Sequence, residues 1–319
     1  MNTELTNQLT ELVGDHFSDQ ISEILKKYDI TRKLLPSVNS NSKLLDSFLS
    51  AKKVEGKSVK TLKYYKSTLS KLLTTIKKTL KKITTDDLRN YLSDFQSQKN
   101  SSNVTIDNIR RIFSSFFSWL EDEDFIVKSP VRRIHKVKTT KVVKETLTDE
   151  ELERLRESAL SYRDRAIVEF LTSTGVRVGE IVNLNIDDIK LYDRSAIVLG
   201  KGSAEREVYF DARTKIHLQR YLSTRSDKNC ALFVANKLPY NRLTIGTIES
   251  IIKKLGKKSS VHHVHPHKFR RTLATRAIDK GMPVEQVQKL LGHVRIDTTM
   301  HYAMVNQANV KISHRKYIG

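Results

Sequence analysis

Apolar residues recur every three or four positions through the first 126 residues, which is the period of an amphipathic helix. Residues 3–28 carry one such stripe and predict one or two helices. Pro36 and the polar run 37–42 (SVNSNS) interrupt the pattern and predict a linker. Because the segment 1–40 is too short to hold a core of its own, we expect a docking or oligomerisation element or a flexible appendage.

Residues 43–126 predict helices only. Ser58 is a favourable N-cap for one helix, and Thr85 precedes an acidic first turn that favours a second. A third helix is expected over 103–121, with a core-facing stripe of Ile106, Ile109, Phe113, Phe116 and Leu120. The opposite face of the first helix is basic and suits either solvent or phosphate contact: Lys60, Lys63, Lys66, Lys71 and Lys77.

The pattern changes after residue 147. Residues 148–151 (TDEE) are a capping box that begins a helix, and 163–171 predicts a buried helix. Three strands joined by tight turns are expected over 189–191, 196–199 and 207–210, and helices over about 212–224, 244–255, 267–280 and 283–291. The predicted fold class is mainly α with a small antiparallel β-sheet.

These patterns divide the chain into an N-terminal helical segment (1–40), a helical domain (43–127), a linker (128–145) and a larger α+β domain (146–319). The linker holds seven lysine and arginine side chains and one acid, Glu145. An extended basic linker between two domains is suited to crossing a DNA groove or backbone.

Charge narrows the class of partner. Lys and Arg together number 57 and Asp and Glu 36, a formal net charge of +21. Such an excess favours a polyanion as the binding partner. The alternative is a soluble protein that is merely basic. Residues 1–40 hold four basic side chains against six acidic ones, so the positive charge lies in the rest of the chain.

The cellular compartment follows from what the sequence lacks. Cys230 is the single cysteine, which excludes an internal disulfide and suits a reducing cytoplasm. No stretch approaches the roughly 20 apolar residues that span a bilayer, and the N-terminus does not resemble a secretory signal. We expect a cytoplasmic, nucleoid-associated protein with no membrane partner.

Five clusters hold the candidate chemistry: TGVRVGEI (174–181), LGKGSAER (199–206), HPHKFRRT (265–272), LGHVRIDTT (291–299) and HYAMV (301–305). In them the sequence resembles the tyrosine recombinase (lambda integrase) family, over about residues 43–310. The resemblance matches Arg177 to the first catalytic arginine, Lys201 to the β-hairpin lysine, His267 and Arg270 to the H-x-x-R pair, His293 to the L-G-H histidine and Tyr302 to the nucleophile. It implies a helical core-DNA-binding domain followed by a catalytic domain.

The two arginines are chemically suited to phosphoryl transfer. A phosphodiester already carries one negative charge, and attack by an oxygen adds more. Without a metal, Arg177 and Arg270 supply the counter-charge through planar forks that match phosphate oxygens. The loss of one such donor typically costs ~3–4 kcal/mol. A lone arginine in a basic chain would more simply be a phosphate-positioning residue or a surface residue.

The other four residues supply proton transfers and one hydrogen bond. The phenol of Tyr302 has a pKa of about 10 in water, so it needs a base, and His267 is the candidate. Lys201 is the candidate acid for the leaving 5′-oxygen, and His293 is expected to donate to a phosphoryl oxygen. A turn lysine usually lies at the surface, and a C-terminal tyrosine is most often a packing or surface residue. The assignment of both residues therefore depends on the whole set. Glu180 either orients Arg177 or is a surface glutamate.

The resemblance implies a covalent 3′-phosphotyrosine and a C-shaped clamp on double-stranded DNA that carries specific recombination sites. It also implies a synaptic homotetramer, and a directionality factor is a further expected partner. Because one ester bond is exchanged for another, neither ATP nor any cofactor is expected. A zinc site in the histidine run 262–267 is less favoured, because structural zinc prefers cysteine and more dispersed ligand pairs.

The box around Arg270 departs from the family's commoner H-x-L-R-H-S/T pattern, with Phe269 before it and Arg271 and Thr272 after it. This variant resembles mobile-element integrases and favours integration, excision or transposition over a chromosome-dimer resolvase. The negative charge of residues 1–40 argues against an arm-DNA-binding domain there. Alternatives are a type IB-like topoisomerase, a non-catalytic DNA-binding regulator and a helical interaction protein.

Overall fold

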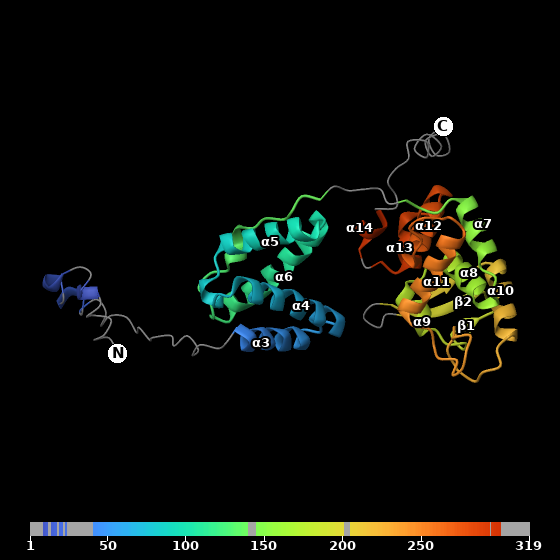
Figure 1. The fold of residues 1–319 in the computed structure, drawn as a ribbon, viewed down its shortest axis with the longest axis horizontal. Coiled ribbons are helices and arrows are strands. Elements are labelled where there is room, and N and C mark those ends of the chain that lie inside the picture. The colour runs from blue at the N-terminus through green and yellow to red at the C-terminus, as the bar shows by residue number, and fades with distance from the viewer. Residues whose placement is uncertain are drawn as a thin grey trace, which may run out of the picture. The chain divides into compact units, whose positions relative to one another are not determined.

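The computed structural model describes residues 9–11, 14–17, 19–21, 23, 41–139, 145–200, 205–293 and 295–300, with the backbone alone at 15, 297 and 298. The chain forms two compact units, Met1–Val142 and Val143–Gly319 (Figure 1). Most of the predicted helices over 3–28, together with Lys201 and Tyr302, lie outside the described residues.

The first unit is helical throughout its described part. After the short 3-10 helix η1 (Asp15–Phe17) come α3 (Asn41–Val54), α4 (Val59–Ile76), η2 (Leu80–Lys82), α5 (Thr85–Lys99), α6 (Asn103–Asp122) and η3 (Pro130–Arg133). Ser58 caps α4 as expected, whereas α5 is capped one residue earlier than expected, by Thr84, in a capping box with Asp87.

The core of this unit is aromatic. Phe113, Phe116 and Leu120 from the α6 stripe are fully buried, and Phe48 of α3 packs against Phe116 with ring centroids 5.0 Å apart. The predicted core-facing stripe of α6 is confirmed. The five lysines predicted on the opposite face of α4 are all exposed.

The first part of the predicted linker is bonded to the helices instead of being free and extended. Asp107, which is buried in α6, accepts from the Val137 backbone N–H at 3.2 Å and pairs with Arg110 and Arg111. Four further bonds fix residues 129–138: Thr85 Oγ1 to Pro130 O, Arg89 Nη2 to Arg133 O, Asn103 Nδ2 to Lys138 O, and Ser129 N to Glu121 Oε2. Residues 129–138 therefore belong structurally to the helical unit.

The second unit combines helices with a three-stranded sheet, of which one face is buried and the other is exposed. In chain order it contains α7 (Asp149–Ser158), α8 (Tyr162–Thr174), α9 (Val178–Asn183), β1 (Ile189–Lys190), β2 (Ser195–Leu199), β3 (Glu205–Tyr209), α10 (Ala212–Ser223), α11 (Ile245–Lys258), α12 (Pro266–Asp279), α13 (Val284–Leu291) and α14 (Ile296–Met300). The strands are antiparallel in the order β1-β2-β3. The predicted fold class, mainly α with a small antiparallel sheet, is confirmed.

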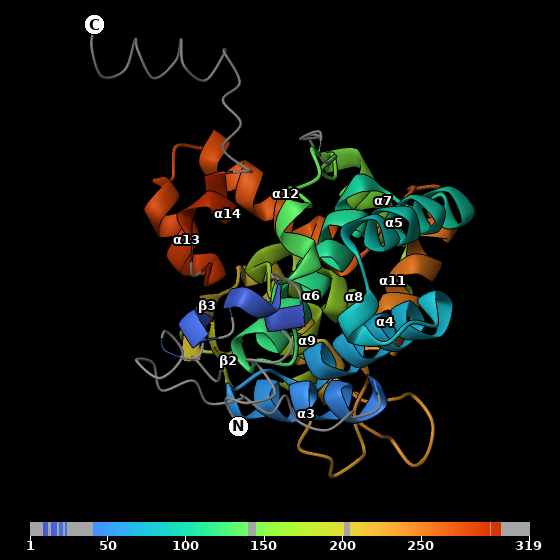
Figure 2. The same ribbon diagram turned by 90° about the vertical axis from the view of Figure 1, so that its left-hand side faces the viewer.

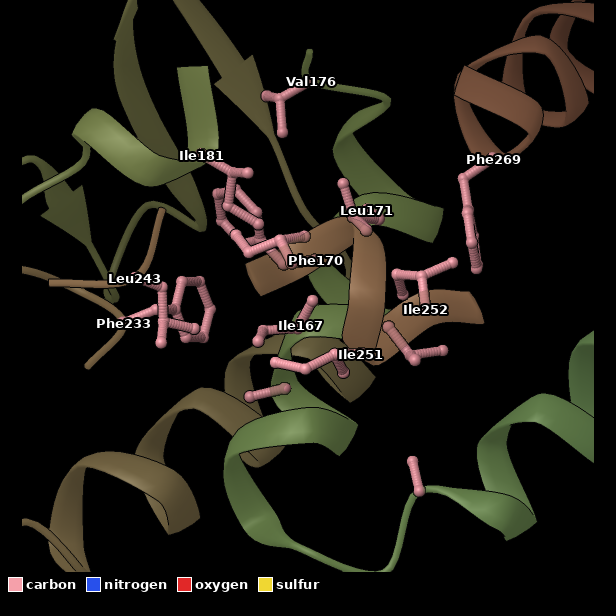
Figure 3. Close-up of a cluster of buried hydrophobic side chains, with 14 of the residues drawn as sticks. Ile167, Phe170, Leu171, Val176, Ile181, Phe233, Leu243, Ile251, Ile252 and Phe269 are labelled. Carbon is pink, nitrogen blue, oxygen red and sulfur yellow. The ribbon is translucent and has the colours of Figure 1, made fainter. Parts of the chain in front are cut away.

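Helix α8 occupies the centre of this unit and packs against both α10 and α12. Its residues Ile167, Phe170 and Leu171 are fully buried, and Figure 3 shows them with Ile181 of α9 and Ile252 of α11 in one cluster. Figure 2 shows α12, α13 and α14 grouped together. This packing holds the ends of α8, α9 and α13 close to one another.

Among the described helices, none combines the length and the apolar content that a bilayer-crossing segment needs.

Candidate active site

The first predicted arginine lies in a tight turn between two helices. Helix α8 ends at Thr174, and its C-cap Gly175 has a φ of +59°, a left-handed conformation that glycine tolerates best. A Cβ at Gly175 would lie 2.7 Å from Leu273 Cδ2, so the absence of a side chain here also allows α12 to pack closely against this turn. Two residues later Arg177 begins α9 as its N-cap. The turn thereby places this arginine beside the start of α12.

Arg177 is held by a carboxylate and a carbonyl. Its Nη1 donates to Glu180 Oε1 at 2.7 Å, its backbone N–H donates to Glu180 Oε2 at 2.8 Å, and its Nη2 donates to Gly292 O at 3.0 Å. Glu180 is buried, so it is no surface glutamate and it orients Arg177. The Arg177 side chain remains 37% exposed and accessible to a ligand.

Arg270 is almost fully buried and links the ends of two helices. Its Nη1 donates to Gly175 O at 2.8 Å, and its Nη2 donates to Leu291 O at 2.5 Å. His267 stands three residues earlier in the first turn of α12, a spacing that puts both side chains on one helix face. Its side chain is exposed.

These three residues line one pocket. The pocket has a volume of about 480 Å³ and is lined by Val176, Arg177, Val178, Glu249, His265, Pro266, His267 and Arg270. Two arginines and two histidines in one concave site make it suited to an anion such as a phosphate.

The C-terminus of α13 draws three arginines together. The consecutive carbonyl oxygens of Leu290, Leu291 and Gly292 accept from Arg206, Arg270 and Arg177 respectively. Carbonyls at a helix C-terminus have no partner within the helix and carry the negative end of its dipole, so they attract guanidinium groups. The arginines therefore converge although they come from distant parts of the sequence.

His293 follows this turn directly. Its Nδ1 lies 2.8 Å from Oγ1 of the buried Thr299. Burial, together with the nearby charges of Arg270 and Arg177, lowers the pKa of His293 from 6.5 to about 4. The imidazole is therefore neutral at pH 7 in this structure. A neutral imidazole has one N–H donor and one acceptor nitrogen.

Sequence comparisons now place the chain among known proteins. Residues 141–309 match the phage integrase family, and residues 44–126 match the phage integrase N-terminal SAM-like domain. The chain belongs to the phage integrase family of tyrosine recombinases. The members of this family are enzymes that break and rejoin DNA strands, and this recombinase is likewise such an enzyme.

Several relatives support this assignment. The recombinase is 31% identical over 290 residues to tyrosine recombinase XerC of Oceanobacillus iheyensis, covering 85% of this chain and 94% of the relative. It is 28% identical over 274 residues to tyrosine recombinase XerA of Pyrococcus horikoshii, covering 85% and 92%. Among solved structures, a lambda integrase dimer bound to a COC′ core site shares the fold, with a TM-score of 0.68 at 20% identity over 92% of this chain and 86% of that one.

Of the six predicted residues, the structure brings Arg177, His267 and Arg270 to one pocket and places His293 directly after the turn beside it. Lys201 and Tyr302 are not described.

In the part of the recombinase that is described, no three His, Cys, Asp or Glu side chains are grouped to hold a metal ion. The His265 and His267 rings are nearly parallel, with centroids 6.4 Å apart.

Two bonded partners of the site were not anticipated, Arg206 and Thr299. Both lie inside motif clusters, at the end of LGKGSAER and of LGHVRIDTT. Their position in these clusters was the only sign in the sequence that they belong to the site. Arg206 bonds Glu180 of a different element, and Thr299 bonds His293 across a turn, so local patterns could not predict either contact.

Proposed function

We propose that this recombinase cuts double-stranded DNA at specific sites, with Tyr302 as nucleophile and a covalent 3′-phosphotyrosine as intermediate. The convergence of Arg177, His267 and Arg270 on one pocket is the observation that carries the proposal. A tyrosine attack on a phosphodiester needs fixed positive charge and a proton acceptor at one place, and this pocket has both. The family's activity supports the same chemistry.

Each described residue has a proposed role. Arg177 and Arg270 stabilise the charge that develops on the phosphoryl oxygens, and His267 accepts the phenol proton. His293, which is neutral, donates one hydrogen bond to a phosphoryl oxygen. In this proposal the Thr299 hydroxyl, which lies 2.8 Å from Nδ1, donates to that nitrogen, and the ring proton is on Nε2. Lys201 returns a proton to the leaving 5′-oxygen, and no metal or ATP is used.

The proposed partner is duplex DNA. The net charge of +21 and the exposed basic face of α4 favour phosphate contacts by both units. Two structures with the same fold were solved on DNA, a lambda integrase dimer on a COC′ core site and XerH on a palindromic difH substrate. We further propose that four copies act together on two sites, with direction set by an accessory factor.

Two biological roles fit this chemistry. The Phe269-Arg270-Arg271-Thr272 box favours integration and excision of a mobile element, as the sequence predicts. The XerC and XerA relatives favour a second role, the resolution of chromosome dimers. The location of the cut sites separates the two. Sites at the ends of a movable segment support the first role, and a single chromosomal site supports the second.

The function can be tested by covalent capture. Adducts that resist detergent are isolated from cells that produce the protein, and the attached DNA is sequenced. A nicked synthetic duplex with the recovered sequence is then incubated with the protein and resolved on a denaturing gel. We expect an adduct with the native protein and with Tyr192→Phe, a control at a tyrosine that is 92% exposed. We expect none with Tyr302→Phe.

An adduct that persists in Tyr302→Phe, or the lack of one with the native protein, would refute the proposal. Strand exchange between two marked duplexes excludes the type IB-like topoisomerase, which would relax a supercoiled plasmid with neither a specific site nor a second duplex. A chelator should leave the adduct yield unchanged.

A further inference from the structure

Arg206 joins three separate parts of the active-site region. It lies on β3, opposite Val198 of β2, and its side chain is only 12% exposed. Its Nη1 and Nη2 donate to the two oxygens of Glu180 at 2.8 and 2.7 Å, and its Nε donates to Leu290 O at 3.2 Å. One guanidinium thus links the sheet, α9 and the C-terminus of α13.

The charge on Glu180 is the reason this link matters. Glu180 also accepts from Arg177 Nη1, so its buried carboxylate lies directly on the guanidinium that faces the pocket. Without Arg206, the ion pair of Arg177 and Glu180 would carry no net charge and would attract a phosphate only weakly. The second guanidinium, from Arg206, leaves the three groups with a net positive charge.

Glu180 is held in its ionised form. Burial opposes ionisation, but hydrogen bonds from Arg206 and Arg177 outweigh it and lower the pKa of Glu180 below its ordinary value. Both carboxylate oxygens are therefore charged acceptors at neutral pH. This fixes the orientation of the two arginines that share them.

Gly292 leaves room for this arrangement. A Cβ there would lie 2.8 Å from Arg206 Cδ and 3.1 Å from its Nε. The Arg206 side chain therefore passes directly over the turn whose Gly292 carbonyl accepts from Arg177. Arg206 and Arg177 are braced by the same carboxylate and the same turn.

We propose that Arg206 is a positioning residue for DNA cleavage: it neutralises Glu180 and so leaves Arg177 its positive charge and its orientation toward the scissile phosphate. The proposal rests on the proposed cleavage function and adds a residue beyond the six matched by the family motifs. Arg206 acts through Glu180 and does not itself bind the phosphate.

The same unit offers a closely matched control. Arg156 of α7 is 11% exposed and donates from Nε and Nη2 to the buried Glu169, whereas Arg206 donates from Nη1 and Nη2 to the buried Glu180. Its bonds join α7 to α8 and do not reach the pocket lining. Replacing either arginine with lysine removes a two-pronged bond to a buried carboxylate and keeps the charge.

The test measures single-turnover cleavage of the captured nicked duplex at saturating protein, with rates corrected for the folded fraction from thermal unfolding. We expect Arg206→Lys to lower the rate about 10-fold, since lysine cannot reproduce the fork. Arg156→Lys should lower thermal stability and leave the corrected rate unchanged. Equal losses in the two variants, or a wild-type rate in Arg206→Lys, would overturn the proposal.

A double-mutant cycle tests the role of charge. Arg206→Gln is expected to slow cleavage about 100-fold in the native background, because Glu180 then cancels the positive charge of Arg177. In the Glu180→Gln background the same substitution should cost no more than about 3-fold, since no charge remains to neutralise. Equal costs in both backgrounds would show a structural role alone. If the native protein forms no adduct at all, that result refutes the proposed cleavage function on which this inference rests. It is thereby distinguished from a failure of the role proposed for Arg206 alone.

Discussion

Arg177 Nη2 donates to the carbonyl oxygen of Gly292 at 3.0 Å, and this bond joins the start of α9 to the C-terminus of α13. The two residues are 115 positions apart in the sequence. The bond gives the arginine a fixed direction, while 37% of its side chain stays exposed for a ligand. A donor held before the ligand arrives costs no reorganisation during the reaction.

Arg177→Ala should therefore abolish most of the cleavage activity. The loss of one fixed donor at a developing charge typically slows the chemical step by about 10²–10³-fold. The measurement is single-turnover formation of the covalent adduct. Arg213→Ala is the control, because Arg213 lies half-exposed on α10 in a 3.3 Å ion pair with Glu153. A loss below about 10-fold for Arg177→Ala would contradict its proposed role.

His293 should make the protein less stable in mild acid. Its pKa in the folded protein is lowered to about 4 from the ordinary 6.5, so the unfolded chain binds this proton more readily. The free energy of unfolding should fall as pH drops from 6.5 toward 4, by at most about 1.4 kcal/mol per unit. Urea unfolding across this window should show a shallower fall for His293→Gln. An identical fall in both proteins would argue against the shift.

Gly292→Ala should be more damaging than an ordinary glycine substitution. Its φ is +62°, and the added Cβ would lie 2.8 Å from Arg206 Cδ. Gly281→Ala is the matched control, because Gly281 also has a positive φ, +91°, but nothing lies within 4 Å of its Cβ position. Both variants carry the backbone strain of about 1–2 kcal/mol, and only Gly292→Ala should also lose cleavage activity. Equal activity in the two variants would show that the Arg206 contact is unimportant.

Asp107→Ala should release the segment 129–138 from the helical unit. Asp107 is buried, pairs with two arginines and accepts from the Val137 N–H, so its removal leaves the part-buried Val137 N–H and Arg110 guanidinium without this acceptor. We expect hydrogen exchange at the Val137 amide to accelerate at least about 10-fold, and stability to fall by about 2–4 kcal/mol. Asp46→Ala, which removes an exposed ion pair with Lys66, should change neither. Unchanged exchange at Val137 would show that Asp107 does not hold the segment.

The agreement between sequence and structure is greatest where interactions are local. The α6 stripe and the capping box of Thr148 and Glu151 are confirmed, because each depends on neighbours within one or two turns. Strand ends were less predictable: β3 begins at Glu205, two residues before the expected start, because pairing with Leu199 of β2 extends it. Cross-strand pairing is a non-local property that periodicity does not contain.

Residue type and spacing were enough to predict the helical and strand elements, the positive charge and the order of the six motif residues. The sharing of Glu180 by Arg177 and Arg206, which approach it from α9 and β3, is a property of the folded protein that residue type and spacing do not contain. The same holds for the turn at Gly292, whose neighbouring carbonyls collect guanidinium groups from three elements. These groups converge because helix ends and buried carboxylates need partners that local sequence does not supply, and packing around α8 brings those partners within reach.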